Sequence, residues 1–384
     1  MNLVWIVSNY PNQYNTGAGI FHLQITRILV KNGHKVTVIA PTPYSNRFLA
    51  KISSKWAHYL KYPRIESNQG VHIIRPRYLA LPGQNYRGLT AWLMYYSLRN
   101  LPHWKEADIV DAHYAYPYGM VANRLAKKHF FANVVSLHGD DVNIDPFHSK
   151  MTMKRFSIII RNASLVQAVS IPLADKAKML SERSKIAIFN LGLELKFPKE
   201  KFIPSSTMGV IRLLYVGALS ADKGMHLILS LLNKNKSWRS EKYEWILIGE
   251  GSFSSLLCEY NNVTLLGQKA NHEVLEQMKQ SHIFVFPSLN EGMPHVLKEA
   301  GSIGLPIVSS KVGGIPQLLD NGRRGWVFDR NNLEELESTL KQALDRYDFS
   351  LLKARLLQDF VYENYNINRN VEDLVMRYKN IIRK

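Results

Sequence analysis

The sequence predicts an α/β protein composed of two doubly wound domains. Short runs of β-branched residues alternate with longer amphipathic segments, which is the pattern of βαβ units around a parallel sheet. The alternation occurs twice, on either side of a polar segment with two prolines at residues 197–209. With 384 residues, of which 46% are hydrophobic, the chain can bury two cores. We therefore expect a first domain at residues 1–196, a linker at 197–209 and a second domain at 210–367.

The order of the elements follows from the same alternation. In the first half, the predicted strands cover residues 3–7, 35–39, 71–75, 109–112, 134–137 and 165–168, and a predicted helix at 20–31 follows the first strand. In the second half, the predicted strands cover residues 212–216, 245–248, 263–265, 283–286 and 306–308. A last helical pattern ends at residue 382. Open parallel sheets bind ligands at the carboxyl ends of their strands, so the loops there are the first candidates for a site.

Basic residues are concentrated in the first part of the chain. The net charge is +18, and residues 1–105 contain 13 Lys and Arg but a single acid, Glu66. Between residues 44 and 64, bases that include Lys51, Lys55 and Lys61 alternate with aromatic and aliphatic residues. On a helix, this pattern predicts a surface that binds anionic lipid headgroups, although a solvated face over a local core has the same pattern. No zinc-finger spacing, RNP-like strand or helix-turn-helix pattern accompanies the charge, so we expect no nucleic-acid partner.

Cysteine content and apolar runs indicate the compartment. The single cysteine, Cys258, excludes an internal disulfide and a cysteine-based metal site, which is typical of a reducing compartment. The first residues lack the basic region of a signal peptide, and no apolar stretch approaches the roughly 18 residues that span a bilayer. We expect a cytoplasmic protein, peripheral on the inner face of the cell membrane if the basic surface binds lipid.

The segment from Glu291 to Glu299 combines a turn of small residues with two carboxylates and the start of a helix. The turn of Gly292, Met293 and Pro294 is expected to bind the donor, and the free backbone N–H groups at the helix start would bind anionic oxygens. Glu291 would lie at the mouth of the loop and Glu299 about two turns down the helix, where a carboxylate can accept from both ribose hydroxyls. This arrangement predicts a nucleotide-sugar site, and the alternative is ordinary surface charge.

Glycine-containing loops carry further candidates for binding the donor. Gly217 ends a predicted strand and Lys223 stands at the next helix start, so backbone N–H groups and one ammonium group could hold a diphosphate. Gly249 ends the following strand, where a missing side chain lets the backbone approach a ligand. In the first half, Gly17 and Gly19 precede the first helix and could bring amides against the donor phosphate or the acceptor. The alternatives are a surface lysine, tight turns and an ordinary helix entry.

Taken in order along the chain, these segments resemble the retaining glycosyltransferases of family four, which have the GT-B fold. Residues 291–299 are similar to the E-x7-E motif of that family. Residues 215–224 (YVGALSADKG) are similar to its V-G-R-L-x3-K-G segment, with Ala218 where the family has Arg. Residues 313–317 (GGIPQ) resemble its G-G-I-P-E, with Gln317 in place of Glu. The resemblance implies two Rossmann-like domains facing each other across a cleft, with a C-terminal helix at 368–384 packing back on the first.

The same resemblance implies roles for residues of the first domain and for one further loop. His138, in the run SLHGDDVN, matches the family's strand-end H-G-x-D, where the histidine lies over the donor sugar. His113 and Tyr114 match the segment at the acceptor cleft, although His113 could equally be a satisfied loop histidine. Gly267 lies in the loop whose main-chain groups bind the nucleobase in the family.

The function implied is transfer of a sugar, with retention of configuration, from a UDP- or GDP-linked donor to a glycan or lipid-linked acceptor in cell-surface polysaccharide synthesis. Glu291 would orient the sugar hydroxyls, Glu299 would bind the ribose, and Lys223 would stabilise the departing diphosphate. Front-face attack assisted by a leaving phosphate oxygen, which is favoured for the family, needs no protein nucleophile. The expected catalytic residues are therefore His138, Glu291 and Lys223. We expect no metal and no other cofactor, and Asp140 and Asp141 could either bind a metal or fix their loop.

Other functions are compatible with parts of the sequence. A GT-B nucleotide-sugar epimerase or a phosphorylase is one alternative, although a pyridoxal-phosphate lysine motif is not apparent. A sugar-nucleotide-binding protein without catalysis is a second, which Ala218 and Gln317 favour. A peripheral membrane scaffold would explain the basic first part but not the motifs of the second. Release of nucleoside diphosphate without an acceptor distinguishes an enzyme from a binding protein.

Overall fold

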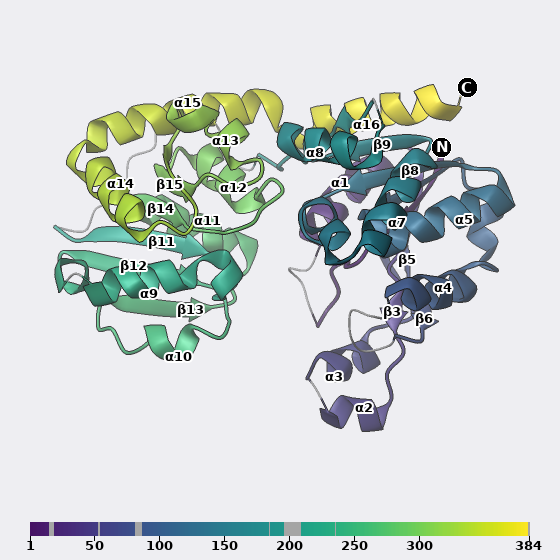
Figure 1. Ribbon diagram of the computed structural model, residues 1–384, viewed down its shortest axis with the longest axis horizontal. Coiled ribbons are helices and arrows are strands. Elements are labelled where there is room, and N and C mark those ends of the chain that lie inside the picture. The colour runs from purple at the N-terminus through teal and green to yellow at the C-terminus, as the bar shows by residue number, and fades with distance from the viewer. Residues whose placement is uncertain are drawn as a thin grey trace. The chain divides into compact units, whose positions relative to one another are not determined.

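The protein is described here by a computed structural model that covers residues 1–14, 19–52, 54–80, 87–183, 185–195, 209–234 and 236–382 (Figure 1). It consists of two compact units. Unit 1 comprises Met1–Phe189 and Asn368–Lys384, and unit 2 comprises Asn190–Ile367. The expected first domain extended to residue 196, but the segment after Phe189 joins unit 2, where the backbone N–H of Leu193 donates to the Tyr365 carbonyl at 2.7 Å. Most of the expected linker lies outside the described residues.

Unit 1 is built on an eight-stranded sheet with the order β10-β9-β8-β7-β1-β2-β5-β4. Its strands are β1 Asn2–Ile6, β2 Lys35–Ile39, β4 Ile65–Asn68, β5 Val71–Ile74, β7 Ile109–His113, β8 Ala132–Leu137, β9 Leu165–Ala168 and β10 Ala187–Ile188. Neighbouring strands are parallel except β4, which pairs antiparallel with β5. A small second sheet pairs β3 Thr42–Pro43 with β6 Arg77–Tyr78.

Helices cover both faces of this sheet. They are α1 Ile20–Lys31, α2 Arg47–Ile52, α3 Ser54–Lys61, α4 Arg87–Leu98, α5 Met120–His129, α6 Asp140–Asn143, α7 Lys150–Arg161, α8 Ile171–Ser181 and α16 Ile367–Ile382. One core cluster forms where Val4 of β1 and Val110 of β7 contact the buried faces of α4 and α5, for example at Met94 and Leu125. Burial on both faces explains why the central strands are mostly apolar.

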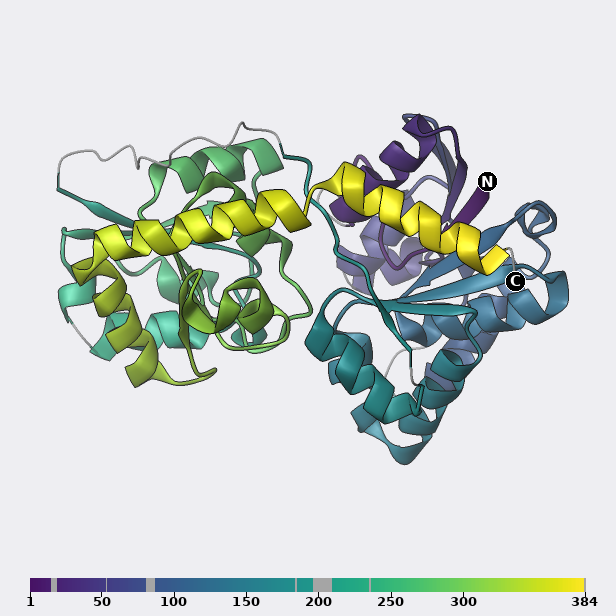
Figure 2. The same ribbon diagram turned by 90° about the horizontal axis from the view of Figure 1, so that it is seen from above.

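The C-terminal helix α16 completes unit 1 from the far end of the sequence. Figure 2 shows it in yellow, lying along this unit. Its residues Val371, Leu374 and Tyr378 are fully buried. The Tyr378 hydroxyl donates to the carboxylate of Asp111 in β7 at 2.6 Å, so the helix is joined to the central sheet by both apolar packing and a buried hydrogen bond.

Unit 2 has a six-stranded parallel sheet with the order β13-β12-β11-β14-β15-β16. Its strands are β11 Ile211–Val216, β12 Tyr243–Ile248, β13 Val263–Gly267, β14 Ile283–Phe286, β15 Ile307–Ser310 and β16 Trp326–Phe328. Its helices are α9 Met225–Lys234, α10 Ser254–Leu257, α11 Asn271–Gln280, α12 His295–Ile303, α13 Ile315–Leu318, α14 Leu333–Asp345 and α15 Tyr347–Asn364. None of the helices within the described ranges has the length and apolar character needed to cross a membrane.

The strand order of each sheet determines which loops can form a site. In unit 1, β1 lies between β2 and β7, and in unit 2, β11 lies between β12 and β14. At such a switch point the loops leave in opposite directions, and a crevice opens at the carboxyl ends of the strands. The loops after β7 and β8 in unit 1, and after β11 and β14 in unit 2, are therefore the segments to consider.

Each predicted strand overlaps an observed strand, and the predicted helix 20–31 is confirmed as α1. The strands β3, β4, β6, β10 and β16 were not predicted, because they are short or, as for β4, polar and at the edge of the sheet. The basic segment at 44–64 forms two short helices, α2 and α3, instead of one.

Candidate active site

The loop between β14 and α12 in unit 2 holds Glu291 in a charged pair. Its Oε1 atom accepts a hydrogen bond from Ser288 Oγ at 2.8 Å and lies 2.8 Å from Nζ of Lys223. The Lys223 and Glu291 side chains are 28% and 13% exposed, so the pair is partly shielded from solvent. The sequence assigned a role to each residue separately, and the structure brings them together from 68 positions apart in the chain.

Gly224 explains how Lys223 reaches this position. Lys223 ends the short 3-10 turn Ala221–Lys223, and Gly224 follows it with a φ of 76°. A Cβ atom on Gly224 would lie 2.0 Å from the carbonyl oxygen of Pro287, so only glycine lets this turn pack against the end of β14. Next to it, the backbone N–H of Leu289 donates to the Asp222 carbonyl at 2.9 Å. The turn after β11 and the loop after β14 are thus packed against each other and joined by a hydrogen bond.

Glu299 lies on α12, eight positions after Glu291. Its Oε1 atom accepts a hydrogen bond at 2.8 Å from Nδ2 of Asn271, the first residue of α11. The sequence placed Glu299 about two turns down its helix. The helix α12 begins at His295, as the sequence predicted, but Glu299 is its fifth residue and so lies just over one turn from the start.

The main chain between the two glutamates is fixed by the loop before α13. The Gly292 carbonyl accepts from the backbone N–H of Gly314 at 2.7 Å. The Met293 side chain is 5% exposed, and its sulfur accepts a weak hydrogen bond from the Tyr365 hydroxyl at 3.8 Å. Met293 can therefore offer a ligand only its backbone, and the same holds for Pro294, the residue that precedes α12.

Three glycines, Gly217, Gly249 and Gly267, lie at the ends of β11, β12 and β13, and Gly249 contacts the other two. The backbone N–H of Gly217 donates to the Ile248 carbonyl, and that of Gly249 donates to the Gly267 carbonyl, both at 2.9 Å. A Cβ atom on Gly249 would lie 1.9 Å from the carbonyl oxygen of Gly217. The missing side chain of Gly249 was expected to let the backbone approach a ligand. In the structure it lets the loop after β12 approach the loop after β11. At the neighbouring position, the Ala218 carbonyl accepts from the hydroxyl of the buried Tyr215 at 2.8 Å.

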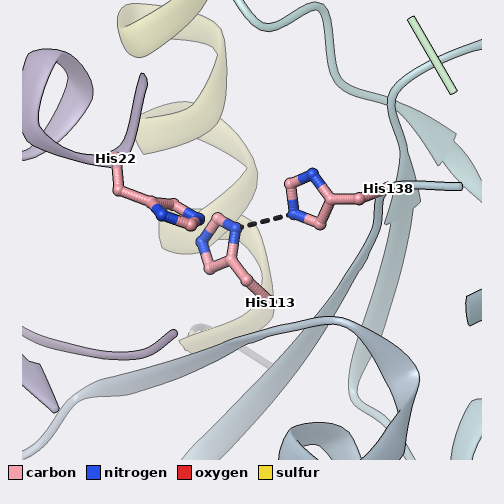
Figure 3. Close-up of side chains that lie close together, drawn as sticks. All are labelled: His22, His113 and His138. Atoms are coloured by element: carbon pink, nitrogen blue, oxygen red, sulfur yellow. Dashed lines mark hydrogen bonds between the residues drawn. The ribbon is translucent and has the colours of Figure 1, made fainter. Parts of the chain in front are cut away.

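In unit 1, His113 and His138 lie side by side with a third histidine, His22 (Figure 3). His113 ends β7, His138 follows β8, and His22 belongs to the first turn of α1. Nδ1 of His113 lies 2.9 Å from Nε2 of His138, within hydrogen-bond distance. The ring centroids of His22 and His113 are 4.4 Å apart. The sequence singled out His113 and His138, but it gave no indication that His22 joins them.

All three imidazoles are electrically neutral at ordinary pH. Burial lowers the pKa of His22 and of His113 well below the usual value, and the neighbouring histidines lower it further. Burial also lowers the pKa of His138 to about 3. Each ring therefore carries one proton and one lone pair, and the hydrogen bonds decide which nitrogen has which.

Asp111 is a buried carboxylate beneath this cluster that sequence reasoning missed. It accepts hydrogen bonds from Ser136 Oγ at 2.8 Å and from the Tyr378 hydroxyl at 2.6 Å. Its Oδ1 atom lies 3.9 Å from Nε2 of His113. Burial raises the pKa of Asp111 to about 6, against the opposing effect of these hydrogen bonds. The sequence did contain one indication of this buried carboxylate, which is an aspartate within a strand of mostly apolar residues.

The loops after β7 and β8 are fixed by Asp141. Its carboxylate accepts from the backbone N–H groups of His138 at 3.1 Å, Gly139 at 2.9 Å and Ala115 at 3.0 Å. Of the two open roles for this aspartate, the structure supports loop fixation. Tyr114, between the loops, has a φ of 77°. Burial raises the pKa of the Tyr114 hydroxyl to about 12.

The glycines expected before α1 are only partly described. Gly17 lies outside the described residues. Gly19 is the residue before α1 and has a φ of 73°, and a Cβ atom there would lie 2.4 Å from the carbonyl oxygen of Asn9. Gly19 thus has a structural reason to be glycine, because it brings the start of α1 against the loop after β1.

Unit 1 also contains a small pocket of about 80 Å³ beside the carboxyl ends of β1, β2 and β5. Its polar wall includes Asn9 and Asn12, together with Arg75, whose Nη1 lies 2.5 Å from a carboxylate oxygen of Glu66. Its aromatic wall is formed by Tyr10, Tyr59, Tyr62, Tyr78 and Tyr118.

The helices α2 and α3 divide their apolar residues between this pocket and solvent. Tyr59 lines the pocket and packs edge-to-face on Trp56 at 5.8 Å. Phe48 and Leu60 are 72% and 44% exposed. The predicted basic aromatic surface is therefore partly a local core and partly an exposed face, and the side chain of Lys55 lies outside the described part.

Lys298 is a second buried charge that the sequence did not reveal, although it lies between the two glutamates of the motif. Its side chain is fully buried on α12, and Nζ donates to the Leu191 carbonyl at 2.5 Å. Burial lowers the pKa of the ammonium group to about 7. It supports the segment that enters unit 2.

The sequence matches two families that between them cover most of the chain. Residues 15–196 match the family described as Glycosyltransferase Family 4, and residues 196–356 match Glycosyl transferases group 1. A protein of Bacillus subtilis (strain 168), named as a teichuronic acid biosynthesis glycosyltransferase, is 28% identical over 403 residues, which is 99% of this chain and 99% of the relative. A colanic acid biosynthesis glycosyltransferase of Salmonella typhimurium is 24% identical over 290 residues, 70% of each chain.

Solved structures confirm the predicted fold. Sucrose-phosphate synthase of Thermosynechococcus elongatus superposes with a TM-score of 0.79 at 16% identity, covering 99% of this chain and 98% of that one. HepE of Anabaena in complex with UDP superposes with a TM-score of 0.70 at 16% identity, covering 99% and 100%. At these identities the likeness establishes the two-domain GT-B architecture.

Proposed function

We propose that this chain, which belongs to the family-four glycosyltransferases and has their GT-B fold, transfers a sugar with retention of configuration from a nucleoside diphosphate to a glycan or lipid-linked acceptor. The relatives named for teichuronic and colanic acid biosynthesis support a role in cell-surface polysaccharide synthesis. The single observation that carries the proposal is the pairing of Lys223 with Glu291 at the carboxyl edge of the unit 2 sheet.

The donor diphosphate is bound at the turn after β11. Lys223 provides a cation there, and its partner Glu291 is the group that incoming phosphate oxygens displace. Charge grows on the diphosphate as the glycosidic bond breaks, so an ammonium group at this point stabilises the transition state more than the bound donor. HepE of Anabaena, of the same fold, was solved with UDP and with UDP-glucose, which makes a uridine nucleotide the first to test.

Glu291 acts by orienting the sugar hydroxyls. Lys223 and Ser288 hold Oε1 of Glu291, which fixes the orientation of the carboxylate. Its second oxygen is then suited to accepting hydrogen bonds from the sugar hydroxyls. With Glu291 in this role, the acceptor attacks from the front face and a phosphate oxygen of the leaving group takes its proton.

His138 contributes a neutral imidazole to the donor sugar. Its backbone is fixed by Asp141 and its ring by the contact with His113, so the side chain is held in one orientation. A neutral ring can donate or accept a hydrogen bond with a sugar hydroxyl. Glu299 binds the ribose, with Asn271 holding its carboxylate in place.

The acceptor binds to unit 1. The pocket lined by five tyrosines offers aromatic faces and polar groups, the combination that binds sugar rings. The exposed residues of α2 and α3 place a basic, partly apolar surface on the same unit, which fits a lipid-linked acceptor presented at an anionic membrane.

A panel of nucleotide sugars tests the proposal. A donor at 100 times its dissociation constant adds about 2.7 kcal/mol to stability, so a thermal shift should identify it among UDP- and GDP-sugars. The identified donor should then be hydrolysed slowly to nucleoside diphosphate in the absence of acceptor. Binding without any release of diphosphate would favour the alternative, a sugar-nucleotide-binding protein, to which Ala218 in the arginine position points.

A further inference from the structure

The histidine cluster of unit 1 has the composition of a metal site. One ring nitrogen of each of His22, His113 and His138 lies within 4.8 Å of the others. Figure 3 shows the His22 ring directed toward His113, which in turn contacts His138. His22 and His113 are 1% and 0% exposed. Their separation is therefore fixed by the packing of the fold, unlike that of mobile side chains on a surface.

We propose that His22, His113 and His138 bind one divalent transition-metal ion of the Zn²⁺ class. Imidazole nitrogen is a preferred ligand of zinc, copper and nickel, whereas Mg²⁺ and Ca²⁺ require oxygen ligands. Three histidines are sufficient for such a site and leave the fourth tetrahedral position for water or another small ligand.

His22 is already oriented as a metal ligand. Its Nδ1 atom lies 3.1 Å from the backbone carbonyl oxygen of Asn9, which can only accept, so the ring proton is on Nδ1 and the lone pair is on Nε2. Within the described residues, this buried Nε2 atom has no hydrogen-bond partner. A carbonyl on the opposite ring nitrogen is the usual outer support of a zinc-binding histidine. A metal ion would satisfy the buried nitrogen.

His113 and His138 supply the other two nitrogens. A proton on Nε2 of His113 faces the Asp111 carboxylate at 3.9 Å, which leaves Nδ1 as the ligand. That Nδ1 atom is 2.9 Å from Nε2 of His138, and two nitrogens bound to tetrahedral zinc are roughly 3.3 Å apart. An ion can therefore replace the proton between them with a small movement, while that proton moves to Nδ1 of His138. Because His138 is on a loop and half-buried, the ion also has a route of entry.

The proposal is tested as metal binding, independently of sugar transfer. The full chain, freed of metal with a chelator, is titrated with Co²⁺ and then Zn²⁺. Co²⁺ in a four-coordinate nitrogen site absorbs visible light, and Zn²⁺, which binds more tightly, should abolish the band at one equivalent per chain. Mg²⁺ should leave it unchanged. A wild-type protein that gives no Co²⁺ band overturns the proposal.

A matched pair of variants assigns the site. His22→Asn keeps a donor for the Asn9 carbonyl but removes the free nitrogen, and it should weaken Zn²⁺ binding at least about tenfold. His272→Asn, at an exposed position of α11, should bind as the wild type does. Melting curves in chelator show whether His22→Asn is folded. A folded His22→Asn protein that binds Zn²⁺ as tightly as the wild type also overturns the proposal.

Discussion

The ammonium group of Lys223 lies 2.8 Å from the same carboxylate oxygen of Glu291 that accepts a hydrogen bond from Ser288. The lysine and the glutamate belong to different loops of one sheet edge, so each is positioned by the other. A phosphate group that binds Lys223 must compete with Glu291, and a sugar hydroxyl that binds Glu291 weakens its hold on Lys223. The pair thus couples recognition of the diphosphate to recognition of the sugar.

Replacing Lys223 should reduce turnover more than donor binding. We expect Lys223→Ala to lower kcat by roughly 100-fold, with a smaller change in KM, because the opposed charge is greatest in the transition state. The rate of donor cleavage at saturating donor measures this effect. Lys279→Ala, which removes a surface lysine paired with Glu276, is the control and should keep full activity. An unchanged kcat for Lys223→Ala would show that Lys223 only forms a surface ion pair and has no role in catalysis.

Replacing each of the two glutamates of the motif should weaken binding of a different ligand. Glu299→Ala is expected to weaken binding of the nucleoside diphosphate by about 1.5–3 kcal/mol, since it loses a charged hydrogen-bond partner of the ribose. Glu291→Gln should not weaken binding of the nucleoside diphosphate, because it removes the charge that competes for Lys223, but it should weaken binding of the complete nucleotide sugar. Calorimetry with both ligands on both variants provides the comparison. Equal affinity of Glu299→Ala and wild type for the diphosphate would remove the ribose assignment.

Lys298 should make stability depend on pH. Burial lowers its pKa from 10.5 to about 7, so the unfolded chain binds this proton more tightly than the folded one. The stability that Lys298 contributes is therefore complete above pH 10.5 and lost as the pH falls toward 7. Lys298→Met should lack this loss, so wild-type stability relative to the variant should fall by about 1.4 kcal/mol per pH unit from pH 10 to 7.

Urea unfolding at several pH values measures this slope, and the exposed Lys242→Met is the control, for which no slope relative to wild type is expected. A constant offset between Lys298→Met and wild type is also expected, because the Leu191 carbonyl loses its donor. Parallel stability curves across this pH range would contradict the burial of the charge.

Unit 1 should bind anionic vesicles. Each Lys or Arg near such a surface contributes about 1 kcal/mol, screened over a Debye length of about 8 Å at physiological salt. Changing Lys51, Lys55 and Lys61 to glutamate should weaken binding at least about tenfold, and added salt should weaken it in the wild type. Vesicle sedimentation tests this. If the wild type does not sediment even at low salt, the basic residues serve solubility or a soluble anionic acceptor instead.

Much of the fold could be predicted from the sequence, because buried parallel strands leave continuous apolar runs. The ends of β7 and β8 could even be expected to lie together, since successive strands of a doubly wound sheet are often neighbours. His113 and His138 were candidates because the segments that contain them resemble those of family four, and both lie at these strand ends. His22 was not, because its position in α1 depends on how the helix packs across the sheet, which no local spacing records.

The buried charges were beyond sequence reasoning for a related reason. Lys298 has the appearance of an ordinary helix-surface lysine, and only the segment that passes over α12 supplies the carbonyl of Leu191. Asp111 depends in the same way on Tyr378, which is 267 positions away. Met293, which was expected at the donor, has its side chain packed against Tyr365, so only its backbone can contact a ligand.

The return of α16 to unit 1 has a consequence for how the protein is made. Unit 2 is continuous in sequence, whereas unit 1 is divided between the first 189 residues and the segment from Asn368 onward. During synthesis on the ribosome, the sheet of unit 1 emerges first but stays without Tyr378, the partner of Asp111, until the whole of unit 2 has been translated. A chain that stops before α16 would leave a buried carboxylate and an apolar groove uncovered, so unit 1 is complete only once α16 has been synthesised.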